Sequence, residues 1–439
     1  MEKNITNFKE QFISYYRDFE DGLNGESTPE LNCLRQKALE TFNELPLPTT
    51  KDEEWRYTNI SPLLKHNFSV ASKESKLSKD QLSQYQFDKL RSHQLVFVNG
   101  NFSSEYSKLN NLPEGVIIGS LSNAIKNSPE IVEKHFGKYA GNEHQIFTAL
   151  STAYTKDGAF VYVPDGKVIE DSVHIIFITS KAKEKIITQP RNLFVAGKNS
   201  QLTIIEHFVS DNENIHFTNS VTEIFTDENA TFDHIKLQEE SKKSFHIARM
   251  EVDQERYSNF RSFSFSKGAS IARNNFNSKF NDESSECTLN GLFLIENEQL
   301  FDAHTLIDHA KPHCNSHELY IGILDDQAKG VFNGKVLVRQ DAQKTNAFQK
   351  NNNIILSDDA LVNTKPQLEI FADDVKCSHG ATIGQLDEEA KFYLKSRGIG
   401  EQNATAILLN AFATDVITPI KVDPVRKHIK NILSKRFKH

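Results

Sequence analysis

The sequence of 439 residues lacks several features that define common protein classes. It contains no run of about 18 apolar residues, so it encodes no evident membrane-spanning helix. The stretch MEKNITNFKEQF lacks the apolar core of a signal peptide, which predicts a cytoplasmic protein. Its four cysteines, Cys33, Cys287, Cys314 and Cys377, are too widely spaced to suggest a disulfide framework, and we expect reduced thiols.

Signatures of several enzyme classes are also absent. The chain has no G-x-x-x-x-G-K-[ST] phosphate loop, no G-x-G-x-x-G, no G-x-S-x-G, no C-x-x-C and no H-E-x-x-H. It is therefore not expected to hydrolyse ATP with a phosphate loop of its own. Lys and Arg number 51 against 59 Asp and Glu, and the net charge of −8 argues against a general nucleic-acid-binding protein.

Three regions differ in pattern. Residues 1–150 read as mostly helical, with one amphipathic helix capped by Thr28 and a strand followed by a turn at Asn99–Gly100. Residues 151–385 consist of short β-rich runs. Residues 386–439 return to helix, beginning with Asp387 as an N-cap. The sequence thus predicts a β core flanked by helical N-terminal and C-terminal domains.

Turn-forming residues punctuate the β region at regular intervals. They recur at Gly268, Asp282, Asn297, Asp326, Asp341, Asp358 and Asp373. The steps between them are similar in length, except that the step from Asn297 to Asp326 is close to two of the others. Without an intervening helical segment, a βαβ sheet is not expected. The even spacing fits a coiled β-helix or a large β-sandwich, and the recurrent Asn, Asp and Gly at corners favour the β-helix.

The segment ADDVKCSHGATIG places Cys377 and His379 two residues apart. On a strand the two side chains would lie on the same face, near enough to lean together. This pattern is compatible with a reactive thiol, a metal site or an ordinary packed strand. Spacing alone favours a buried cysteine beside a hydrogen-bonded histidine.

A second dense segment is DAHTLIDHAKPHCNSH, with histidines at 304, 309, 313 and 317. Imidazole and thiolate are suitable donors for zinc, iron or copper, so His309, His313 and Cys314 are candidate metal ligands. Spacings of 5, 4 and 4 do not place the rings on one face of a strand. The favoured interpretation is a set of hydrogen-bonded turn and strand histidines.

The C-terminal helices carry a possible partner surface. Aromatic residues crowd an otherwise charged helix, and an apolar run follows it in AILLNAF. Such residues either pack on the β core or form an exposed binding patch. The candidates for partner binding are Phe392, Tyr393, Arg397, Leu408, Leu409 and Phe412.

The segment KPQLEIFADDVKCSHGATIGQLDEEAKFYLKSRGI resembles the hallmark segment of the SufB/SufD family, on its SufD side, and the upstream run GVFNGKVLVRQDAQKTNAFQKNNNIILSDDALVNT extends the match. The element EEWRYTNI is similar to the family's Trp–basic–Tyr–Thr element. The family supplies scaffold subunits of the Suf iron–sulfur cluster assembly system. The resemblance implies a right-handed parallel β-helix core between the two helical regions, and so decides against the sandwich.

The resemblance further implies a non-enzymatic subunit of a SufBCD complex. It would pair with SufB through the end of the β-helix and with the ATPase SufC through the C-terminal helices, or with a second copy of itself when isolated. His379 is then the first candidate iron ligand and Cys377 the second, for a transient cluster shared with SufB. Reduced flavin (FADH2) is associated with the assembled complex, but no residue here is assigned to it.

The alternative is a polysaccharide-active β-helix enzyme using carboxylates such as Asp325, Asp358 or Asp373.

Overall fold

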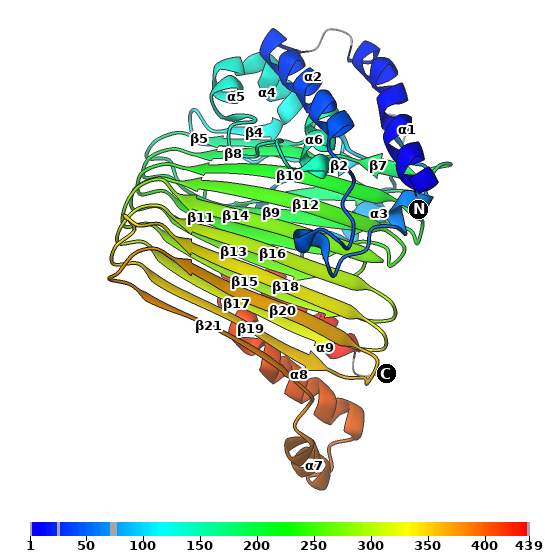
Figure 1. Ribbon diagram of the computed structural model, residues 1–439, viewed down its shortest axis with the longest axis vertical. Helices are drawn as coiled ribbons and strands as arrows, with labels where there is room; N and C mark the ends of the chain where they lie inside the picture. The colour runs from blue at the N-terminus through cyan, green and yellow to red at the C-terminus, as the bar shows by residue number, and fades with distance from the viewer. Residues whose placement is uncertain (1, 24–26, 71–76, 437–439) are drawn as a thin grey trace.

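The computed structural model describes residues 2–23, 27–70 and 77–436 (Figure 1). A stack of parallel strands forms the body of the molecule, with most N-terminal helices at one end and α7 projecting beyond the other. None of the helices within the described residues combines the length and apolar character needed to cross a membrane. The expected fold class, a parallel β-helix between helical regions, is confirmed.

The N-terminal region forms helices that pack on the first coils. Thr28 caps α2 as expected, because its hydroxyl accepts a hydrogen bond from the Leu31 N–H at 3.3 Å. Phe8, Phe12, Phe42 and Tyr154 form part of one buried cluster there. The helical elements are α1 (Glu2–Asp21), α2 (Pro29–Glu44), α3 (Lys79–Ser83), α4 (Leu121–Asn127), α5 (Pro129–His135) and α6 (Ile146–Ala153), with single turns η1 (Glu53–Trp55) and η2 (Leu63–Lys65).

This region also supplies strands to the core. The strands are β1 (Ser69–Val70), β2 (Ser92–Val98), β3 (Asn101–Phe102) and β4 (Ile117–Ser120). β2 and β3 form the expected hairpin, with positive φ at both Asn99 and Gly100. β2 then pairs in parallel with the first full strand of its sheet, so the solenoid begins inside the region that the sequence assigned to helix.

From β5 onward the chain coils without an intervening helix, and alternate strands belong to two facing sheets. One sheet holds β5 (Ala159–Val163), β7 (Ile186–Thr188), β8 (Arg191–Ala196), β10 (Phe217–Thr226), β12 (Phe245–Gln254), β14 (Ile271–Phe280), β16 (Leu300–His309), β18 (Lys329–Val338) and β20 (Leu361–Ile370). The other holds β6 (Ser172–Thr179), β9 (Gln201–Ser210), β11 (Thr231–Glu239), β13 (Asn259–Ser266), β15 (Glu286–Ile295), β17 (Asn315–Leu324), β19 (Asn346–Ile355) and β21 (Lys376–Gly384).

The turn-to-turn step seen in the sequence is about half of one coil. Within one sheet, Phe245 of β12 lies in register with Ile271 of β14, and Lys329 of β18 with Leu361 of β20. One full coil therefore takes about two of the steps. One corner repeats a left-handed residue once per coil, at Asn199, Asn229, Tyr257, Ser284, His313 and Lys344. Each of these donates its backbone N–H to the next coil, as from His313 to the Gln343 carbonyl at 2.9 Å, so the corners are stacked and hydrogen-bonded.

Phenylalanine fills much of the interior. Phe97, Phe177 and Phe208 stack on successive strands, with ring centroids 5.1 and 4.7 Å apart. Phe293 and Phe301 stack across the two sheets at 4.7 Å. Because parallel in-register strands place like residues above one another, flat rings can form ladders in a thin core.

The C-terminal helices are α7 (Glu388–Ser396), α8 (Glu401–Ile417) and α9 (Asp423–Arg436). Asp387 caps α7 as expected, accepting from the N–H groups of Glu389 and Ala390. α8 and α9 lie against the outer face of the second sheet. Their apolar residues Leu409, Val416, Ile429 and Leu433 share a buried cluster with Ile235, Phe265, Leu294 and Ile323 of the strands. These two helices therefore help to stabilise the solenoid.

Close packing of the interior leads to a stability prediction. At Gly322 an added Cβ would lie 2.3 Å from Cζ of Phe293 and 2.4 Å from Oδ1 of Asn353. Gly322→Ala should lower the free energy of unfolding by about 1–3 kcal/mol, since the core must shift to accept the methyl group. Gly119→Ala is the matched control, because no heavy atom lies within 4 Å of its added Cβ. Thermal unfolding would measure both, and equal midpoints would contradict the packing argument.

Candidate functional site

The last coil ends the solenoid without a further strand. β20 and β21 are the terminal strands of their two sheets. Cys377 lies in register with Ala347, and His379 with Gln349. Since Ala347 and Gln349 are buried in the interior, Cys377 and His379 share the interior-facing side of β21, as their spacing predicted. His379 is nevertheless exposed, because no coil covers it.

Cys377 is less available than His379. Its side chain is half-buried and packs against a small apolar cluster that includes Val336, Val338 and Ala347. Burial raises the pKa of the Cys377 thiol, although a hydrogen bond involving the Ala347 backbone acts in the opposite direction. The thiolate is the form that binds metals, so Cys377 must lose a proton in an unfavourable setting. Of the two side chains, His379 is therefore the more accessible one for binding a metal.

The interior just behind β21 is polar, a feature that was not predicted from the sequence. Glu318 of β17 and Gln349, Asn351 and Asn353 of β19 are all 3% exposed or less. Gln349 Nε2 donates to Glu318 Oε2 at 2.7 Å, and Asn353 Nδ2 donates to Asn351 Oδ1 at 2.7 Å. Burial raises the pKa of Glu318 to about 7. The polar residues Gln349, Asn351 and Asn353 at every second position of a β-rich region were the signal that could have revealed this layer.

The histidine segment is spread over different environments. His309 is buried in the interior and shares a hydrogen bond with Ser316 Oγ at 2.8 Å, and burial lowers its pKa to about 3. His313 occupies a corner with φ of 61°. Cys314 is buried, which raises its pKa to about 11. His317 is exposed and its ring stacks on Phe348. Over the described ranges, no three His, Cys, Asp or Glu side chains are grouped so that they could hold a metal ion.

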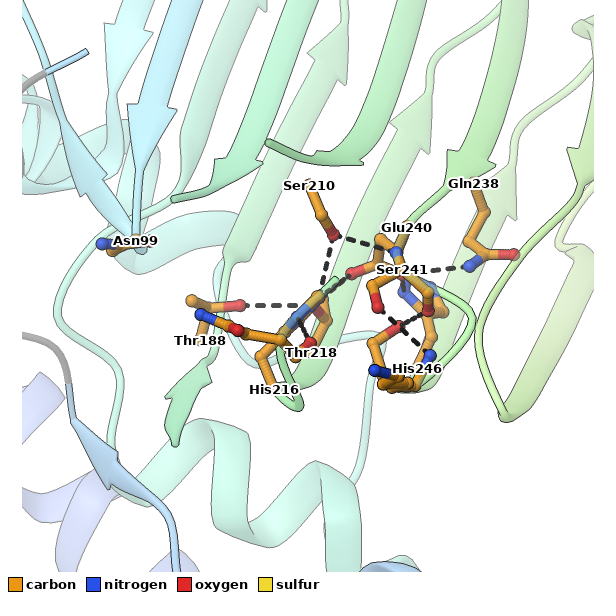
Figure 2. Close-up of polar contacts among 12 residues, drawn as sticks. Asn99, Thr188, Ser210, His216, Thr218, Gln238, Glu240, Ser241 and His246 are labelled. Carbon is orange, nitrogen blue, oxygen red and sulfur yellow. Dashed lines mark hydrogen bonds and ion pairs between the residues drawn. The ribbon is translucent and has the colours of Figure 1, made fainter. Parts of the chain in front are cut away.

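A different polar network is enclosed where β10 and β12 begin (Figure 2). Glu240 accepts hydrogen bonds from Thr218 Oγ1 at 2.5 Å, His246 Nδ1 at 2.7 Å and Gln238 Nε2 at 3.2 Å. Burial opposes its ionisation, yet His246 and His216 hold the pKa of Glu240 well below its usual range. All five side chains are buried, and the network holds together one corner of the solenoid.

The acidic pairs considered for a polysaccharide-active enzyme lie at corners. Asp326 has φ of 53°, and the Asp325 carboxylate accepts the Asp326 N–H at 2.9 Å. Asp358 and Asp373 fall in the turns before β20 and β21. Asp326 and Asp358 line one open depression at the corners together with Glu298 and Asp359, whereas Asp325 and Asp373 are not among its lining residues.

The C-terminal candidates separate into two groups. Phe392 and Tyr393 of α7 are 73% and 57% exposed, and the Arg397 guanidinium lies over the Tyr393 ring at 5.2 Å. Leu408 is partly exposed on α8. Leu409 is fully buried and Phe412 packs against the same cluster, so these two positions belong to the interface with the sheet. The sequence grouped them with the exposed residues because its periodicity did not fix which face of α8 meets the sheet.

Comparison with known proteins agrees with this architecture. The family model described as SUF system FeS cluster assembly, SufBD core domain, matches residues 177–412, and the SufBD protein N-terminal region matches residues 6–175. An iron–sulfur cluster assembly SufBD family protein of Synechocystis is 37% identical over 92% of this chain and 90% of its own length. The iron–sulfur cluster assembly proteins SufD of Escherichia coli and Bacillus subtilis are 32% and 26% identical, covering 92% and 93% of this chain and 92% and 94% of their own lengths. The chain therefore belongs to the SufB/SufD family of SUF-system iron–sulfur cluster assembly proteins.

Proposed function

We propose that this protein is a scaffold subunit without catalytic activity of its own, which joins SufB through the open end of its solenoid and the ATPase SufC through α7 and neighbouring C-terminal residues. The observation that carries the proposal is the pair Cys377 and His379 on the interior side of a terminal strand. A terminal strand is where a second chain can add its own ligands. The cluster is cargo that the assembly builds and releases.

The end of the solenoid has the features of a protein interface. A terminal strand presents backbone N–H and C=O groups that another strand can pair with. β20 and β21 are ten and nine residues long, which is enough for extended pairing. Large apolar side chains are exposed on these strands or directly after them: Ile370 is 39% exposed, Phe371 64% and Ile383 47%. SufB is the partner assigned to this end, and a second copy of the chain occupies it when SufB is absent.

A junction between two chains suits transient cluster binding. One or two ligands from each subunit hold iron less permanently than a closed four-ligand site, so the cluster can be passed on. His379 is the first iron ligand of this chain and Cys377 the second, in the order set by exposure and by the raised thiol pKa. Reduced flavin is assigned to the assembled complex, with no residue of this chain proposed to bind it.

α7 is the proposed contact for SufC. It projects beyond the solenoid (Figure 1). Its side chains Phe392 and Tyr393 are exposed to solvent. Glu401 holds it to α8 through Lys391 and Lys395, at 3.0 and 3.1 Å. An aromatic pair with an adjacent Arg, on a helix fixed by salt bridges, has the composition of an interface hot spot. The absence of a phosphate loop in this chain makes nucleotide hydrolysis the partner's task.

The function is tested by co-expressing the chain with SufB and SufC and isolating the complex without oxygen. His379→Ala should leave the complex intact by size exclusion and lower iron and acid-labile sulfide per complex by about half or more, because an imidazole ligand has no local substitute. Cys377→Ser should have a smaller effect if the thiol only packs, and an equal one if it also binds iron.

His317→Ala is the control for loss of a histidine near the same end. His317 is exposed like His379, but it faces outward and stacks on Phe348. Its removal should leave iron and sulfide at wild-type content. Unchanged content in the His379→Ala complex would refute the assignment of His379 as a ligand.

The SufC contact is tested separately. Phe392→Ala combined with Tyr393→Ala should weaken SufC binding by about tenfold or more, since such aromatic anchors contribute roughly 1–2 kcal/mol each. Tyr15→Ala removes an aromatic residue of similar exposure, 45%, from α1 at the opposite end. That control should bind SufC normally. Isothermal titration with purified SufC measures both, and equal affinities would place the ATPase contact elsewhere.

A further inference from the structure

The polar layer behind β21 is built around one fixed glutamine. Gln349 lies between Glu318 and His379 in the interior, because Glu318 is its register partner on β17 and His379 its register partner on β21. Its side-chain Nε2 donates to Glu318 Oε2 at 2.7 Å. This amide is therefore attached to the coil beneath it, and its orientation is set from inside the solenoid.

The packing around Gln349 leaves it little freedom. An added Cβ at Gly334 would lie 2.4 Å from Gln349 Nε2 and 2.8 Å from its Cδ, so the amide rests against the bare backbone of the facing strand. With Nε2 assigned to Glu318, the acceptor Oε1 is fixed on the other side of the amide. Across the described part of the chain, this Oε1 is buried and has no hydrogen-bond partner.

A buried acceptor without a donor is uncommon in protein interiors and calls for an explanation. The next interior position along the stack is His379. A histidine that binds a metal through one ring nitrogen usually donates the N–H of the other nitrogen to a carbonyl or carboxylate, which fixes its tautomer and ring orientation. Gln349 Oε1 offers an acceptor of that kind one strand away from His379.

We propose that Gln349, held by Glu318, is a positioning residue for His379: its Oε1 accepts the N–H of one imidazole nitrogen and leaves the other nitrogen free to bind iron at the subunit junction. This inference rests on the proposed function for the role of His379 as a ligand. In this structure the two side chains do not hydrogen-bond, so the proposed contact requires the His379 side chain to rotate toward Gln349 Oε1. Both residues belong to this chain. The contact can be tested before any iron is added.

The first experiment uses the full-length isolated chain labelled with 15N-histidine, with His379 assigned through His379→Ala. In the wild-type chain the imidazole 15N shifts of neutral His379 should show one dominant tautomer. Gln349→Met keeps the side-chain volume and removes the acceptor, so the two tautomers should become mixed. Identical His379 spectra in the wild type and Gln349→Met would overturn the inference.

Asn351→Leu is the matched control. Asn351 is also buried on β19, and its amide donates to the Tyr320 carbonyl at 3.2 Å, but its register partner on β21 is Ala381. It should lower thermal stability to a similar degree and leave the His379 tautomer unchanged. A tautomer change as large in Asn351→Leu as in Gln349→Met would show a general loosening of β19, and would also overturn the inference.

The second experiment uses the complex with SufB and SufC. Gln349→Met should weaken Fe(II) binding by about tenfold, the lower range for loss of a group that orients a metal ligand. Wild-type affinity in Gln349→Met would contradict the positioning role. An unchanged iron content in the His379→Ala complex would instead refute the proposed function. The tautomer measurement on the isolated chain would still decide the role of Gln349.

Discussion

The fold depends on the backbone hydrogen bonds between successive coils. Each coil satisfies the polar groups of the coil before it, through the parallel strands and the left-handed corner residues. A stack of this kind has two ends, and at each end a terminal strand has backbone N–H and C=O groups that no further coil pairs with. At the N-terminal end β3 and β4 add antiparallel strands and helices cover the first coils. At the other end β20 and β21 remain terminal, and this constraint creates the candidate site.

The interior is polar at more than one level of the stack. The early and middle coils combine stacked Phe residues, such as Phe177 on Phe208, with a buried pair in which His234 Nε2 lies 2.8 Å from Glu206 Oε2. The last coils place the polar side chains of Glu318, Gln349, Asn351 and Asn353 in the interior. Burying four polar side chains costs free energy that apolar residues would avoid. An apolar core would stabilise these coils more. The polar side chains of the last coils lie directly behind the strand that carries His379, where the proposed function gives Gln349 a role.

Much of this could be predicted from the sequence because the corners have a chemical signature. Asn297 and Asp326 adopt the left-handed conformation that their side chains tolerate, and the spacing of such turns gave the half-coil length. The spacing of Cys377 and His379 correctly gave one shared face. The packing of Leu409 on the sheet could not be predicted, because α8 is apolar on several sides. Nor could the pairing of Gln349 with Glu318, which depends on the register between two different coils.

The two proposed partner surfaces are adjacent in the chain. β21 ends at Gly384 and α7 begins at Glu388, so only a short link joins the strand of His379 to the helix of Phe392. Leu386 in this link packs against the cluster beneath α8 and α9. The salt bridges of Glu401 further connect α7 to α8, which is itself packed on β15 and β17. Under the proposed function, force applied by the ATPase at α7 therefore reaches the terminal strand through a short and well-packed path. On that proposal, the scaffold would couple the partner's nucleotide hydrolysis to the junction without a catalytic group of its own.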